Sequence, residues 1–150
     1  MEHTNLQKIK SLEELSEFTK NFLTSLPESE KATVVALSGD LGVGKTTFVQ
    51  TLAKQLGIVE PVTSPTFTLM KRYISTDTKF STLVHMDAYR LESETEVRPL
   101  RLDDIFKTQG VLFCIEWAEK ISSVLPKETI FLTLSIDDAG VHTIQRESNQ

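Results

Sequence analysis

The sequence predicts an α/β fold, a three-layer sandwich around a mostly parallel central sheet that ends in an antiparallel C-terminal hairpin. Two apolar, β-branched runs, 33–38 and 111–115, are typical of strands buried on both faces of a parallel sheet. Segments with helical periodicity alternate with such runs along the chain, which favours an α/β arrangement. The last two expected strands, 130–136 and 141–146, are separated by the turn sequence Asp-Asp-Ala-Gly and predict the hairpin.

The N-terminal segment predicts a helix preceded by at most a short strand. Leu6 and Ile9 are compatible with an edge strand, and residues 1–10 are otherwise expected to be a loose terminus. Ser11 opens the capping-box pattern S-x-x-E, after which apolar residues recur at helical spacing. Pro27 predicts the end of this helix, because the residue before a proline is disfavoured in helical conformation.

The middle of the chain predicts a second helix and a hairpin. The helix follows a glycine-rich turn after the first buried strand, and Gly57 is its expected C-terminal cap. The segment 61–66 contains two prolines and is expected to be a loop. Runs 67–74 and 79–86 predict an antiparallel hairpin across the turn sequence Ser-Thr-Asp-Thr, and the polar stretch 87–108 has room for short helices.

Length and composition exclude several classes of protein. A chain of 150 residues predicts one domain, 1–150, and a net charge of −5 argues against direct gripping of DNA or RNA. A single cysteine, Cys114, excludes an internal disulfide framework and a zinc site with several thiolates. No apolar run reaches the about 20 residues that cross a bilayer, and the N-terminus does not resemble a signal peptide. These features predict a cytoplasmic protein that does not bind membranes.

The strongest chemical signal is the segment 39–46, G-D-L-G-V-G-K-T, a full match to G-x-x-x-x-G-K-[ST]. Its glycines allow backbone N–H groups to turn toward a phosphate, and the following helix directs its positive end to the same anion. Lys45 is expected to reach the β- and γ-phosphates, and the Thr46 hydroxyl to bind Mg²⁺. A buried strand before the motif and an amphipathic helix after it distinguish it from a glycine-rich turn that binds nothing. The sequence therefore predicts a nucleoside triphosphate site on a P-loop NTPase-like fold.

Two carboxylates are candidates for the metal site. Asp87 follows the apolar strand 82–86, and Glu116 follows the strand 111–115. Ligands of parallel sheets bind beyond the carboxyl ends of the strands, so both carboxylates reach the phosphate-loop edge if both strands run parallel to the first. We expect at least one of them to serve the metal; the alternative is that each is a solvated strand end. His85, on the same face as Asp87, is within reach of the site, although such a histidine is more often structural.

Three further residues leave alternatives open. Thr66 lies on a loop between the phosphate-loop helix and the next strand, where a nucleotide-sensing switch is found, but a plain turn residue is an equal alternative. Trp117 is either a cover of the core or a contact platform. His142 is assigned to an edge strand.

Taken together, these motifs resemble the TsaE (YjeE) family, small bacterial ATPases required for threonylcarbamoyladenosine (t6A) modification of tRNA. The resemblance runs from about Ser11 through the final strand, nearly the whole chain. It is carried by G-D-L-G-V-G-K-T-T at 39–47, T-S-P-T-F at 63–67, H-M-D-A-Y-R-L at 85–91 and I-E-W at 115–117.

The resemblance implies a role for each matching residue. Thr46 and Glu116 would hold Mg²⁺, with Asp87 as a further candidate ligand that is needed for hydrolysis. Lys45, Asp87 and Glu116 are the expected catalytic residues. A switch would be formed by Ser64, Pro65 and Thr66. The start of the first helix would lie near the adenine, so the expected ATP-binding residues are Ser11, Gly39, Asp40, Leu41, Gly42, Val43, Gly44, Lys45, Thr46 and Thr47.

The resemblance also implies a function and a partner. An ATPase that requires Mg²⁺ would support the TsaD–TsaB heterodimer, which transfers threonylcarbamoyl to adenosine 37 of tRNA. Contact with tRNA would be indirect, through that complex, which suits an acidic chain; binding to DNA is not expected.

Two other functions remain open. A small-molecule kinase would deliver the γ-phosphoryl group to a metabolite, but it would need an acceptor pocket and an arginine-rich lid, and the five arginines are scattered. A nucleotide-binding interaction module with negligible turnover would use ATP only to stabilise a docking surface. The carboxylates of Asp87 and Glu116 argue against such a module, because a purely structural nucleotide site has less need of them.

Overall fold

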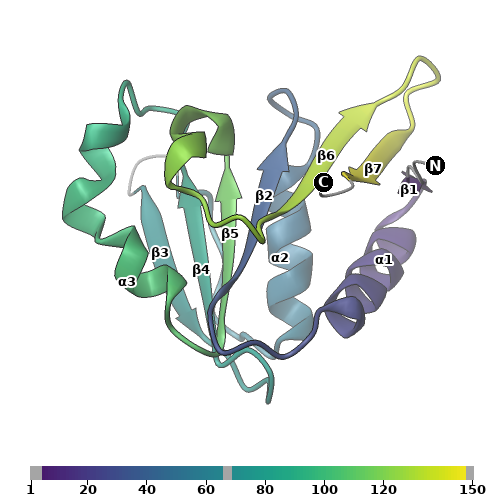
Figure 1. Ribbon diagram of the computed structural model, residues 1–150. Helices are drawn as coiled ribbons and strands as arrows, with labels where there is room; N and C mark the ends of the chain where they lie inside the picture. The colour runs from purple at the N-terminus through teal and green to yellow at the C-terminus, as the bar shows by residue number, and fades with distance from the viewer. Residues whose placement is uncertain (1–4, 66–68, 148–150) are drawn as a thin grey trace.

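The computed structural model describes residues 5–65 and 69–147 and builds them around one seven-stranded sheet (Figure 1). The elements follow in the order β1 (Asn5–Ile9), α1 (Leu12–Ser25), β2 (Thr33–Ser38), α2 (Lys45–Gln55), β3 (Met70–Ile74), β4 (Thr82–Asp87), the 3-10 helix η1 (Glu94–Leu100), α3 (Leu102–Phe106), β5 (Val111–Glu116), the 3-10 helix η2 (Ala118–Val124), β6 (Ile130–Ile136) and β7 (His142–Arg146).

The strands lie in the order β1-β7-β6-β2-β5-β4-β3. The central strands β6, β2, β5 and β4 are parallel to one another, which requires the crossover connections that the helices supply. Antiparallel pairs lie at both edges: β3 with β4 on one side, and β6 with β7 and β7 with β1 on the other. The predicted α/β fold and its C-terminal hairpin are confirmed, with a parallel centre in a mixed sheet.

Helices cover both faces of the central sheet, so that β2 and β5 are buried on both sides as their apolar sequences predict (Figure 1). On one face α1 and α2 pack through the rings of Phe18, Phe22 and Phe48; the last two have centroids 6.1 Å apart. On the other face η1, α3 and η2 enclose a second apolar cluster that includes Phe106 and Phe113. Two cores therefore hold β2 and β5, which end at the phosphate-loop motif and at Glu116.

The predicted helix boundaries are confirmed at both helices of the first face. The Ser11 hydroxyl accepts a hydrogen bond from the Glu14 N–H at 3.1 Å, and the Glu14 carboxylate accepts one from the Lys10 N–H at 2.8 Å. These contacts satisfy N–H groups that have no partner within the helix. Helix α1 ends at Ser25, two residues before Pro27.

Strand β7 begins one residue later than predicted, at His142, and strands β3 and β4 also begin later. Strand β4 begins at Thr82 because the Asp77 carboxylate accepts hydrogen bonds from the N–H groups of Lys79 and Phe80, which extends the turn. Strand β3 begins at Met70; Leu69 has a φ of 68°, outside the strand region, and residues 67 and 68 of the predicted strand lie outside the described part of the chain. Strands β3 and β4 pair antiparallel as predicted.

Cys114 lies in β5, where its thiol is fully buried in the core. Burial raises the pKa of this thiol to about 12, because the charged thiolate loses its hydration there. Among the described helices, none has the length and apolar character needed to cross a lipid bilayer.

We expect the substitution Gly57→Ala to lower the free energy of unfolding by more than the about 1–2 kcal/mol that a left-handed backbone usually costs a residue with a Cβ. Gly57 has a φ of 81° at the end of α2, and an added Cβ would also lie 2.0 Å from Thr76 Oγ1. Urea unfolding measures the effect. Gly140→Ala is the matched control, because Gly140 has a φ of 82° with no atom within 4 Å of the added Cβ. Equal losses in the two variants would contradict the contribution of the Thr76 contact.

Candidate functional site

The phosphate-loop motif connects the end of β2 to the start of α2, at the carboxyl edge of the central strands. Gly39 allows close packing there: its φ is 142°, and a Cβ would lie 2.2 Å from the Leu134 carbonyl oxygen of β6. Gly44, with a φ of 102°, is the N-cap of α2 and provides no side chain to the first N–H groups of that helix. This geometry suits an anion, since unpaired N–H groups and the positive end of the helix dipole face the same point.

Lys45 is nearly buried, with 5 % of its surface exposed. Its Nζ donates a hydrogen bond to the Gly39 carbonyl and lies 3.9 Å from the centroid of the Trp117 ring. Burial lowers the pKa of Lys45 below its usual value, and the negative charges of nearby carboxylates, Glu116 first among them, oppose the shift. The ammonium group is thus held in a partly desolvated position, where a phosphate would stabilise its charge.

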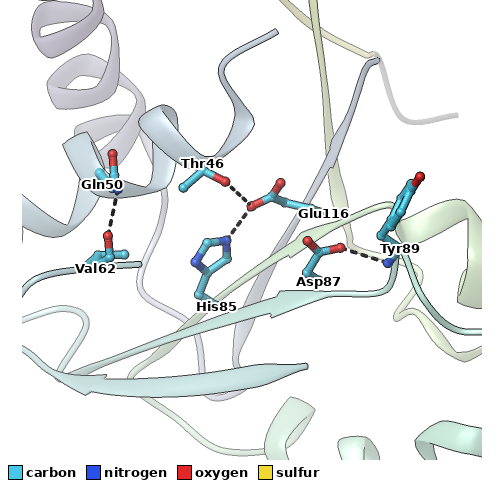
Figure 2. A network of polar contacts seen from close by, with 7 residues as sticks. All are labelled: Thr46, Gln50, Val62, His85, Asp87, Tyr89 and Glu116. Atoms are coloured by element: carbon cyan, nitrogen blue, oxygen red, sulfur yellow. Dashed lines mark hydrogen bonds and ion pairs between the residues drawn. The ribbon is translucent and has the colours of Figure 1, made fainter. Parts of the chain in front are cut away.

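Asp87 and Glu116 come together at this edge, as the sequence predicts for parallel strands. Strands β2, β5 and β4 run parallel, and Asp87 and Glu116 are register neighbours at the ends of β4 and β5, each 4 % exposed. Glu116 Oε2 accepts a hydrogen bond from the Thr46 hydroxyl at 3.1 Å, and Asp87 accepts one from the Tyr89 N–H at 2.8 Å (Figure 2). Both carboxylates are therefore fixed strand ends within the site rather than solvated ones.

His85, for which the sequence left open a place in the site or a structural role, contacts the site directly (Figure 2). Its side chain is fully buried in β4, and its Nε2 lies 2.7 Å from Glu116 Oε2. The signal in the sequence was the two-residue spacing from Asp87, which places His85 on the same sheet face. The contact itself depends on the register of β4 against β5, which the local pattern does not contain.

A pocket of about 320 Å³ joins these groups. Its walls are the loop and helix residues Leu41, Gly42, Gly44, Lys45, Thr46 and Thr47, together with Ser64, Asp87, Tyr89, Glu116 and Trp117. Tyr89 and Trp117 form an aromatic rim, with ring centroids 5.1 Å apart. Trp117 packs against the second core and also contacts Lys45. It is therefore both a cover of the core and a contact platform, the two alternatives that the sequence left open.

A second pocket of about 340 Å³ adjoins the first on the other side of the phosphate loop and shares Gly44 and Thr47 with it. Its lining is mainly apolar and comes from the end of β1, the start of α1, the phosphate loop, the start of α2 and strands β6 and β7. Ser11 and His142 both line it. The assignment of His142 to an edge strand is wrong: β1 pairs outside β7, and the Nδ1 of His142 lies 3.3 Å from the Val43 carbonyl oxygen.

The expected switch lies partly within the described residues. Ser64 lines the first pocket, and Pro65 follows it in the loop; Thr66 lies outside the described part of the chain. The start of this loop is tied to α2, because Gln50 donates a hydrogen bond to the Val62 carbonyl at 2.8 Å (Figure 2). Lys71 of β3 donates another to the Thr63 hydroxyl at 2.8 Å.

The site offers a small number of oxygen atoms as ligands for a metal ion. In residues 5–65 and 69–147, no group of three or more His, Cys, Asp or Glu side chains is arranged to hold a metal ion. The Thr46 hydroxyl and the carboxylates of Asp87 and Glu116 are hard oxygen donors. Mg²⁺ is commonly held by one or two carboxylates plus the phosphates of a substrate, so this donor set fits Mg²⁺ that arrives with a nucleotide.

The sheet order, the two cores and the loop between β2 and α2 define a protein of the P-loop-like α/β class. The family model "Threonylcarbamoyl adenosine biosynthesis protein TsaE" matches residues 9–147, and the chain belongs to the TsaE family. The role of this family is in the biosynthesis of threonylcarbamoyladenosine in tRNA.

Individual relatives agree with this assignment. The tRNA threonylcarbamoyladenosine biosynthesis protein TsaE of Bacillus subtilis is 46% identical over 101 residues, which cover 67% of this chain and 60% of that protein, less than two thirds of its length. The protein of the same name from Rickettsia bellii is 38% identical over 151 residues, with 98% of this chain and 99% of the relative covered. The crystal structure of Bacillus subtilis YdiB is similar with a TM-score of 0.78 and 30% identity, covering 100% of this chain and 88% of that one.

Proposed function

We propose that the chain binds ATP with Mg²⁺ at the first pocket and hydrolyses it in support of the TsaD–TsaB heterodimer, which transfers threonylcarbamoyl to adenosine 37 of tRNA. One observation carries the ATPase part of the proposal. Lys45, Thr46, Asp87 and Glu116 meet at the pocket where α2 begins and two parallel strands end. The family's part in t6A biosynthesis supports the remainder.

The phosphates would lie on the phosphate loop. The N–H groups at the start of α2 donate to them, and the Lys45 ammonium turns from the Gly39 carbonyl to the β- and γ-phosphate oxygens. The nucleoside would occupy the second pocket beside Ser11, because that pocket is apolar and continuous with the phosphate loop through Gly44 and Thr47.

Thr46 and Glu116 would hold Mg²⁺, with Asp87 beside them. When bound, this ion neutralises charge on the transferred phosphoryl group. The buried carboxylates then have a second task, the orientation of the attacking water, and Asp87 and Glu116 are both candidates for it. Ser64, at the edge of the same pocket, would report the γ-phosphate to the following loop.

We expect slow ATP hydrolysis by the chain alone and a clear increase when TsaD and TsaB are added together. Phosphate release, measured for the chain alone, then with the heterodimer, then with tRNA, checks this. A partner can complete a P-loop site by adding one charged or water-positioning group, and such a group raises the rate of hydrolysis by a large factor. The Lys45→Ala protein in the same mixture is the control for contaminating ATPases.

Each contrary outcome has a distinct meaning. Unchanged turnover in the presence of TsaD and TsaB would contradict the partner proposal. Transfer of the γ-phosphoryl group to a metabolite would indicate the small-molecule kinase instead. Tight ATP binding with no turnover under any of these conditions would indicate the nucleotide-binding interaction module.

A further inference from the structure

His85 makes a contact that the proposed function does not use. The imidazole Nε2 lies 2.7 Å from Glu116 Oε2, the same oxygen that accepts the hydrogen bond from the Thr46 hydroxyl (Figure 2). Within the part of the chain that the structure describes, both hydrogen bonds to the Glu116 carboxylate go to Oε2. The other oxygen, Oε1, is left for a ligand from outside the protein.

The hydrogen bond indicates which ring nitrogen of His85 donates. An ionised Glu116 only accepts hydrogen bonds, so a ring nitrogen at 2.7 Å has to donate, and the proton lies on Nε2 of His85. In the neutral ring Nδ1 then carries a lone pair. This atom is buried and has no hydrogen-bond partner among the described residues.

Packing alone does not account for this arrangement. His85 lies on the sheet face covered by α2, in a row with Leu83, and Cys114 is its register neighbour on β5. All three side chains are fully buried. An apolar side chain would fill such a position without leaving a buried nitrogen unpartnered, which costs stability. The compensating feature at His85 is its contact with Glu116.

We propose that His85 is a positioning residue that fixes the Glu116 carboxylate beside Thr46 through its Nε2–H, so that Oε1 is held ready for the metal ion. The inference rests on the proposed function, since it concerns the same Mg²⁺ site. Residues that hold a metal ligand in place through a hydrogen bond typically change metal affinity about 10- to 100-fold when they are replaced. Nucleotide binding without metal depends on the phosphate loop and is not expected to involve His85.

Two amide substitutions separate a donor role from a packing role. In His85→Gln the side-chain amide reaches about as far as Nε2 of histidine, whereas in His85→Asn it reaches only as far as Nδ1 and stops short of Glu116. Both replacements are neutral and bury one amide, so they differ mainly in the position of the donor.

The experiment measures binding of a non-hydrolysable ATP analogue as Mg²⁺ is titrated, and again in EDTA. Mn²⁺, followed by its paramagnetic resonance signal, reports the metal directly. We expect His85→Asn to raise the metal concentration needed for half-maximal effect about 10- to 100-fold. We expect His85→Gln to stay close to the parent protein, and all three proteins to bind the analogue equally in EDTA.

Equal metal requirements in the parent, Gln and Asn proteins would overturn the positioning role while leaving the ATP site intact. Failure of the parent protein to bind the analogue at all would instead contradict the proposed function. Should either variant fail to fold, nitrogen-15 spectra of the histidine rings in the parent protein still decide the question. A proton on Nδ1 of His85 rather than Nε2 would overturn the inference.

Discussion

Replacing Lys45 with alanine is expected to weaken ATP binding roughly 10- to 150-fold, the range that corresponds to loss of a charged hydrogen bond of about 1.5–3 kcal/mol. Lys45 is the cation of the phosphate loop that already lies within the first pocket, where its Nζ contacts the Gly39 carbonyl and the face of Trp117. Calorimetric titration with ATP measures the loss. The fluorescence of Trp117, the single tryptophan, gives an independent signal because its ring contacts the same ammonium group.

The fold is expected to survive this substitution. The pKa of Lys45 is lowered in the folded protein by burial, so the protonated side chain costs stability at neutral pH. That cost is full below the lowered pKa and disappears as the pH rises from the lowered pKa to the ordinary pKa of lysine, whereas removal of the side chain removes it at every pH. We therefore expect the melting temperature without nucleotide to stay near that of the parent or to rise.

Lys54→Ala is the matched control. It removes the same charge from the last turn of the same helix, away from both pockets. This variant should bind ATP like the parent protein. Normal ATP binding by Lys45→Ala, or an equal loss in Lys54→Ala, would contradict the assignment of the phosphate loop.

The substitution Glu116→Gln is expected to lower the rate of Mg²⁺-dependent hydrolysis on the order of 100-fold, the usual size for loss of one preorganised electrostatic group. The amide keeps the shape of the side chain but removes the charge beside Thr46 and Asp87. Nucleotide binding in EDTA should be unchanged or slightly stronger, because one negative charge near the phosphates is gone. Turnover in the presence of TsaD and TsaB, set beside binding in EDTA, measures the two effects separately.

Glu119→Gln is the control for charge alone. Glu119 is exposed and lies near enough to Lys45 to affect its pKa. If the loss in Glu116→Gln comes from the position of the carboxylate, Glu119→Gln should hydrolyse ATP at nearly the parent rate. Equal losses in both variants would show that only the overall charge near Lys45 matters.

The elements that the sequence predicts correctly are those with a strong local pattern. The run 33–38 is β2 to the residue, because a strand buried on both faces is apolar along its whole length. Helix α1 follows from Ser11 and Pro27, which define its two ends through local hydrogen bonding and sterics. The meeting of Asp87 with Glu116 also follows, since parallel strands present their carboxyl ends at one edge.

What the sequence does not predict depends on pairing between distant segments. The contact of His85 with Glu116 requires the register of β4 against β5, and the interior position of the strand that carries His142 requires β1 to pair outside β7. Neither register is coded by a local pattern. The late start of β4 has a different cause, a turn stabilised by the Asp77 side chain, which alternation of apolar residues does not report.

Because β1 pairs with β7, the pocket beside Ser11 can form only late in the folding of the chain. One wall of this pocket follows directly after the first strand of the chain, and the facing wall belongs to the last strand, with His142 and Ile144. During synthesis on the ribosome, the phosphate loop and α1 emerge long before β7, so the pocket proposed for the nucleoside lacks this wall until β7 has emerged. Under the proposed function, tight nucleotide binding would then require β1 and β7 to have paired.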